Sequence, residues 1–119
     1  MGWIETVEIE RKIHAHLRVL AAPADVQIGG WLHESIRWNV ASELGLTFDD
    51  WYGVLAGRRA TEPIHEKRWR ALERVDAALE ALGGVAEDVW THEALRTHPL
   101  WADVRQAASA ALVDWEAES

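Results

Sequence analysis

The chain has 119 residues, of which 12 are basic and 20 acidic, and its formal net charge is −8. This length fits one domain with a real hydrophobic core, and 49% hydrophobic with 27% charged residues is ordinary for a globular protein. Because cysteine is absent, disulfides, thiolate chemistry and cysteine zinc sites are excluded. No leader pattern and no run of about 18 apolar residues occurs, so we expect a cytoplasmic protein without membrane contact.

Tryptophan and arginine dominate their residue classes. The chain has eight Trp against one Phe and one Tyr, and ten Arg against two Lys. Each Trp can bury a large area, so we expect a Trp-rich core. The excess of Arg and Ala suggests a GC-rich genome, bacterial or phage.

Apolar residues at helical spacing predict an all-α fold, a five- to six-helix globular domain containing a helix-turn-helix. Residues 1–119 form a single domain in this prediction, with a helix-turn-helix core over 31–82 and an acidic C-terminal helical part over 85–119. The first predicted helix covers residues 3–21. Its apolar stripe is Ile9, Ile13, Leu17 and Leu20. Pro23 ends this helix, and residues 22–30 form a connection.

A second predicted helix runs from about residue 31 to 44, and a third spans about 48–56, with a tight turn between them. Ala41 is small where two crossing helices would touch, and Gly45 accepts the positive φ of the turn. In this prediction, Thr47 caps the N-terminus of the third helix and Gly57 ends that helix. Trp51 fills the gap between the second and third helices. This spacing is typical of a helix-turn-helix.

The stretch over residues 37–59 resembles the Cro/C1-type (λ-repressor-like) helix-turn-helix domains. The matching residues are Val40, Ala41, Leu44, Gly45, Leu46, Trp51, Val54, Leu55 and Gly57. The chain departs from the family pattern in the size of Trp51, in Gly53 within a helix, and in Asp49 and Asp50, where polar or basic side chains are more usual.

The resemblance implies that the 48–56 helix reads double-stranded DNA. The implied contacts come from its exposed N-terminal residues and from the basic residues beyond it, namely Thr47, Phe48, Asp49, Tyr52, Arg58, Arg59, Lys67 and Arg68. Residues 58–74 carry six basic and three acidic groups, whereas 75–119 carry two and nine. A basic island beside a helix-turn-helix is the charge pattern of a DNA reader. The alternative is a solvated helix face with i,i+4 pairs such as Glu66 with Arg70.

Three further helices are expected after the motif. The longest covers 64–82 and ends at Gly83 and Gly84, a short one lies within 85–96, and the last follows Pro99. The last helix carries a stripe at spacings of three and four, formed by Trp101, Val104, Ala108, Ala111 and Trp115. This stripe packs either inside the monomer or as the seam of a homodimer, which a two-fold DNA reader needs.

Two functions follow from these patterns. The leading hypothesis is a small sequence-specific DNA-binding regulator of bacterial or phage origin. The alternative is an acidic protein-interaction module, an antitoxin or a phage-encoded inhibitor, that binds a protein partner rather than DNA, with the acidic C-terminal part as a possible contact. Because no phosphate-binding loop, nucleophile elbow or HExxH motif occurs, we expect no enzyme activity, no cofactor and no metal.

Overall fold

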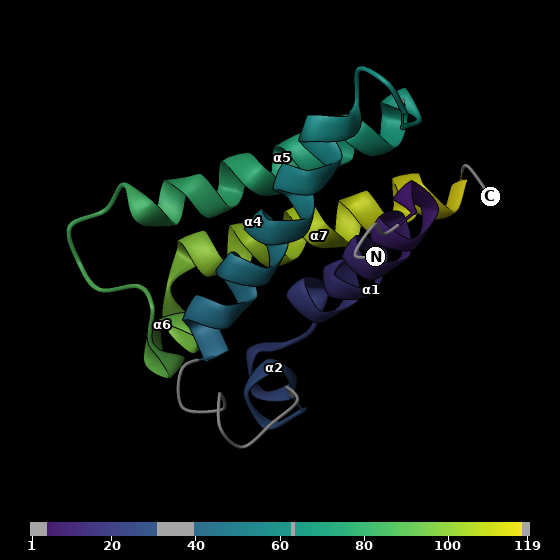
Figure 1. Ribbon diagram of the computed structural model, residues 1–119. Helices are drawn as coiled ribbons and strands as arrows, with labels where there is room; N and C mark the ends of the chain where they lie inside the picture. Colours follow the sequence, from purple (N-terminus) through teal and green to yellow (C-terminus); the bar gives the residue numbers. More distant parts are fainter. Residues whose placement is uncertain (1–4, 31–39, 63, 118–119) are drawn as a thin grey trace.

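Six α-helices, and no strand, make up the residues described by the computed structural model (Figure 1). The described residues are 5–30, 40–62 and 64–117. The helices are α1 (Thr6–Ala21), α2 (Ala24–Gly30), α4 (Val40–Arg58), α5 (Glu66–Gly83), α6 (His92–Thr97) and α7 (Pro99–Ala117). None of the helices in these ranges is long and apolar enough to cross a bilayer. The all-α prediction is confirmed.

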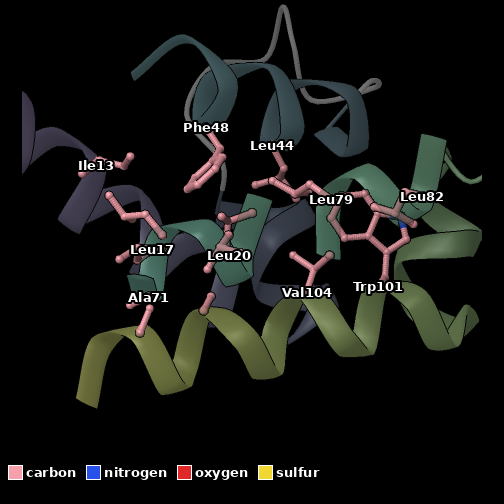
Figure 2. Close-up of a cluster of buried hydrophobic side chains, with 14 of the residues drawn as sticks. Ile13, Leu17, Leu20, Leu44, Phe48, Ala71, Leu79, Leu82, Trp101 and Val104 are labelled. Carbon is pink, nitrogen blue, oxygen red and sulfur yellow. The ribbon is translucent and has the colours of Figure 1, made fainter. Parts of the chain in front are cut away.

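The apolar stripes predicted for α1, α5 and α7 form one core. The four residues of the α1 stripe are at most 1% exposed, and Leu72, Val75 and Leu82 of α5 are equally buried. α7 packs on both α1 and α5, while α4 crosses in front of α5 and α7 and packs mainly on α1 (Figure 1). Figure 2 shows Leu44 and Phe48 pointing from α4 into this core.

The predicted turn at Gly45 is wrong, because α4 is one continuous helix from Val40 to Arg58. Gly45 does not have a positive φ. The apolar residues on both sides of it lie in phase on one helical face, and Ala41, Leu44, Phe48 and Leu55 are all at most 2% exposed. An unbroken helix buries that whole face, which a turn would split. Residues 31–39, with the start of the predicted second helix, lie outside the described residues.

Gly45 has a different role in this fold: it lets Trp90 approach α4. A Cβ added at Gly45 would lie 3.2 Å from Cζ3 and 3.5 Å from Cη2 of the Trp90 indole. The same indole packs edge-on against Trp101, with ring centroids 5.8 Å apart. Gly45 therefore gives the Trp90 side chain close contact with α4, and a Cβ there would push against the indole.

The connection predicted over residues 22–30 is also wrong in part, because α2 occupies Ala24–Gly30. Its Gln27 is 1% exposed, and its Nε2 donates hydrogen bonds to the carbonyls of Val19 and Leu20 at 3.0 and 3.1 Å. These carbonyls belong to the last turn of α1, where Val19 also accepts from the Ala22 N–H at 3.2 Å. The α2 turn thus satisfies the end of α1.

The stripe of α7 is used inside the monomer. Trp101, Val104, Ala108 and Ala111 are at most 1% exposed, and Trp115 is 5% exposed. Because these side chains fill the core against α1 and α5, they are not at the surface for a partner. The predicted dimer seam is therefore wrong, and its alternative, packing within the monomer, is what the structure has.

A buried histidine links α1 to α4. His16 is 5% exposed, and its Nε2 lies 2.8 Å from the Leu44 carbonyl oxygen. Since a carbonyl only accepts, Nε2 carries the proton of this bond. Burial lowers the pKa of His16, against the smaller opposing effect of the Leu44 hydrogen bond.

The two α4 glycines provide a test of the continuous helix. Gly53→Ala is expected to raise the free energy of unfolding by about 1 kcal/mol, because alanine favours a helix interior, and a Cβ there meets nothing within 4 Å. The gain corresponds to a thermal midpoint about 4 °C higher. Gly45→Ala is expected to gain less, because its methyl pushes against Trp90. Thermal unfolding measures both, and equal gains would contradict the Gly45–Trp90 contact.

The His16 bond makes stability depend on pH. Because the pKa is lowered in the folded chain from 6.5, the unfolded chain binds the proton first, so stability falls as pH drops below that value. His16→Gln keeps an N–H donor and removes the titration. We expect the free energy of unfolding, measured with urea, to fall more steeply for the wild type than for the variant between pH 7 and about 5. The difference in slope is at most about 1.4 kcal/mol per pH unit. Parallel curves would contradict the assignment.

Candidate functional site: an acidic groove between α4 and α5

Two aromatic residues predicted to contact DNA bases, Phe48 and Tyr52, pack within the fold instead. Phe48 is fully buried, and its ring stacks on Tyr52 with centroids 5.4 Å apart. Tyr52 in turn stacks on Trp69 at 4.9 Å, and the Arg59 guanidinium lies 4.5 Å from the Trp69 ring centroid. These side chains therefore form one intramolecular stack, and the predicted exposure of Phe48 is wrong.

The basic island is largely engaged by carboxylates of the same chain. Arg68 bonds Glu10 of α1 at 3.0 Å and also lies over Trp115. Arg74 bonds Asp114 of α7 at 2.8 Å, and Glu66 accepts from both Arg59 and Arg70. Arg58 donates to Thr6, and both Arg58 and Lys67 have additional interactions. The alternative of a helix face with paired charges describes this island well.

The other predicted residues are divided between the core and the surface. Ala41 is buried and Trp51 is half-buried, with the Lys12 ammonium 5.8 Å from the Trp51 ring. The predicted position of both residues between two helices of a motif is wrong, because Ala41 and Trp51 lie on the single continuous helix α4. Gly57 lies one residue before the end of α4. Thr47 is half-buried inside the helix and caps nothing there, whereas Asp49 is exposed.

An open groove lies beside Asp49, between α4, the C-terminal half of α5 and the segment before α6. Its volume is about 640 Å³, within the range of ligand-binding pockets. The lining residues are Ser42, Gly45, Leu46, Asp49, Leu79, Glu80, Gly83, Gly84 and Trp90. Leu46 is 56% exposed, so a leucine side chain stands open to solvent at the groove. The surface is mainly apolar, with carboxylates at its margin.

The Trp90 side of the groove is held in place by several bonds. The Trp101 Nε1–H donates to the Val89 carbonyl at 2.7 Å, and Val89 is buried. The Trp90 N–H donates to Asp88 Oδ1 at 3.0 Å. His98 accepts from the Leu100 N–H through Nδ1, so its Nε2 donates to Glu87, at 3.0 Å. This bond lowers the pKa of Glu87. The groove is therefore formed before any ligand binds.

Three carboxylates without partners lie in the groove or next to it: Asp49 and Glu80 line it, and Asp76 lies one turn before Glu80 on α5. Asp49, Asp76 and Glu80 make no ion pair with any described residue. Partial burial, then repulsion from Asp50 and Glu80, raises the pKa of Asp49. Partial burial, then repulsion from Glu80 and Asp49, raises the pKa of Asp76. The three negative charges thus act on one another across the two helices.

This arrangement suits an organic cation with an apolar part. In the described part of the chain, no three His, Asp or Glu side chains are placed to hold a metal ion together. Some acidic side chains elsewhere, Glu10, Asp25 and Asp114, pair with an arginine, whereas other exposed ones make no ion pair with a described residue. The distinguishing feature of Asp49 and Glu80 is therefore their position in an apolar groove. Unpaired like charges beside an apolar surface are the kind of perturbed group found at functional sites.

Sequence reasoning missed most of the groove. The sequence predicts Leu46 only as a motif position, and it assigns Asp76 and Glu80 no role. Leu79 and Trp90 simply lie within the ranges 64–82 and 85–96 that are predicted to hold helices. Two sequence features point to the site: Asp76 and Glu80 are like charges at i,i+4, and Asp49 and Asp50 do not suit DNA. The sequence contains no indication that these segments meet.

Comparison with known proteins adds no relative. No family model, no curated protein and no solved structure matches this chain. The resemblance to Cro/C1-type domains therefore stays a prediction, and the tight turn on which it depends is not present in α4. The function must be inferred from the geometry of the molecule itself.

The repulsion among the groove carboxylates predicts a variant more stable than the wild type. Asp76→Asn removes one like-charge i,i+4 contact and is expected to raise the free energy of unfolding by about 0.2–0.5 kcal/mol at pH 7. The pKa of Asp76 is raised from 3.8 in the folded chain, so ionised Asp76 destabilises the fold only as the pH rises through that raised pKa. At lower pH the variant and the wild type are therefore expected to be equally stable.

Asp114→Asn is the matched control, because it removes the same charge but breaks the bond to Arg74. We expect this variant to be no more stable than the wild type. Urea unfolding at pH 7 and pH 3.5 measures both variants. A loss of stability in Asp76→Asn at pH 7 would show that the carboxylates do not repel one another.

Proposed function

We propose that this chain is an acidic protein-interaction module that binds a protein partner through the groove between α4 and α5. The observation that carries the proposal is the presence of unpaired carboxylates around an exposed apolar hollow. Apolar contact supplies affinity in protein interfaces, and charge complementarity supplies specificity and a faster association rate. Antitoxins and phage-encoded inhibitors are the classes of protein that this proposal favours.

The distribution of charge supports a protein rather than DNA as the target. Binding DNA requires cations that can approach phosphates, and the arginines of the basic island already bond carboxylates of α1, α5 and α7. On α4 the exposed carboxylates Asp49 and Asp50 would face the phosphates. Phe48, the implied contact to a thymine methyl, is buried.

The proposal is tested by placing a photo-crosslinking amino acid at Leu46, in cells of the source organism. Leu46 is 56% exposed and lines the groove, so we expect it to capture one defined partner protein. The same amino acid at Val113 on α7, which is 67% exposed, is the control and should not capture that partner. Mass spectrometry identifies the products.

A gel-retardation assay at low salt tests the alternative. We expect no retardation of genomic DNA fragments by the wild type. Retardation that is lost in Arg58→Ala/Arg59→Ala, together with no crosslink from position 46, would replace the present proposal with the DNA-binding regulator.

A further inference from the structure

We infer that the partner presents a basic amphipathic helix, which lies along α4 with its apolar side chains in the groove and its Lys or Arg side chains at Asp49, Asp76 and Glu80. This inference rests on the proposed function, because it specifies the segment that the groove receives. It is carried by the shape of the α4 surface, the placement of the charges and the absence of a sheet edge among the described residues.

The exposed face of α4 continues from the groove as a straight stripe. Leu46, Asp49, Gly53 and Gly57 follow one another at spacings of three and four, and all are exposed. A Cβ added at Gly53 or Gly57 would meet nothing within 4 Å, so bare backbone faces solvent there. The stripe is about 17 Å long. A second helix of about three turns can therefore lie close to it, with one end over Leu46.

The carboxylates lie within reach of cations on a helix along α4. Asp49 of α4 and Glu80 of α5 both line the groove, and Asp76 lies one turn before Glu80. Because α4 crosses α5 (Figure 1), we expect different Lys or Arg side chains of the partner helix to reach the α4 and the α5 carboxylates. Neutralising these charges would relieve the repulsion in the free protein, so cations are favoured over neutral donors at these positions.

The hollow between the carboxylates requires an apolar side chain. Its apolar lining includes the exposed Leu46, the half-buried Trp90 and the buried Leu79. An amphipathic helix that carries Leu, Met or Phe at i and i+3 or i+4 places apolar groups on one face and cations on its flanks. Both requirements of the groove are then met by one short segment.

An extended segment fits this surface less well. Extended peptides gain affinity by pairing their backbone with a strand at a sheet edge, and the described residues include no strand. A helix satisfies its own backbone hydrogen bonds and needs none from the groove. The geometry therefore favours a helical partner segment.

The test is a selection from a displayed library of random 16-residue peptides against the full-length protein. We expect the enriched peptides to carry Lys or Arg and apolar residues at helical spacing. A synthetic copy of an enriched peptide should gain helical circular dichroism on binding. Enrichment of acidic or proline-rich peptides, or of none, would overturn the inference.

Two triple variants show where such a peptide binds. Asp49→Asn/Asp76→Asn/Glu80→Gln removes the groove charges and is expected to weaken binding about tenfold or more. Glu5→Gln/Asp103→Asn/Glu116→Gln removes the same total charge from exposed residues that do not line the groove, and its effect should stay below about twofold at physiological salt. Equal losses in the two variants would overturn the inference, because attraction would then be non-specific.

The result is separable from that of the proposed function. If position 46 captures a partner protein in cells but the selected peptides are not basic helices, the helical inference fails and the proposed function stands. If position 46 captures nothing and no peptide depends on the groove, both fail.

Discussion

Burial of one continuous apolar face of α4 against α1 is the constraint on which the groove depends. Ala41, Leu44 and Phe48 lie on that face, and the His16–Leu44 bond fixes the contact from the α1 side. Because α4 is turned toward α1, it crosses α5 with little contact (Figure 1). The space between them is then closed on one side by Trp90 and left open on the other. A turn at Gly45 would have removed both the crossing and the Trp90 contact.

The ion pairs of the chain explain why negative charge is left at this position. Arg68 bonds α1 and Arg74 bonds α7, so the N-terminal half of α5 is held by cations. The C-terminal half, residues 75–83, carries Asp76 and Glu80 and contains no Lys or Arg. α5 is therefore charge-paired at one end and repulsive at the other. The groove lies at the repulsive end.

The stripes of α1, α5 and α7 were predictable because their apolar residues repeat in phase and end at Pro23, Gly83 and Pro99. The prediction failed at Gly45, where local turn preferences were given more weight than the phase of the apolar residues on both sides. It failed at α2 because this helix is held by tertiary contacts, the hydrogen bonds from Gln27 to the end of α1, which the local sequence does not show. The groove was not predictable, because its lining comes from two distant segments, residues 42–49 and 79–90, and the sequence does not show how α4 crosses α5.

The stability of the free chain and the affinity for a cationic partner are linked through the same carboxylates. Repulsion among Asp49, Asp76 and Glu80 raises the free energy of the folded chain. On the proposed function, a partner's cations remove this repulsion only in the complex, so the relief adds to the binding free energy. Paired carboxylates, such as Asp114 with Arg74, cannot contribute in this way because their interaction is already made. On the proposed function, the unpaired charges therefore favour the bound state over the free one.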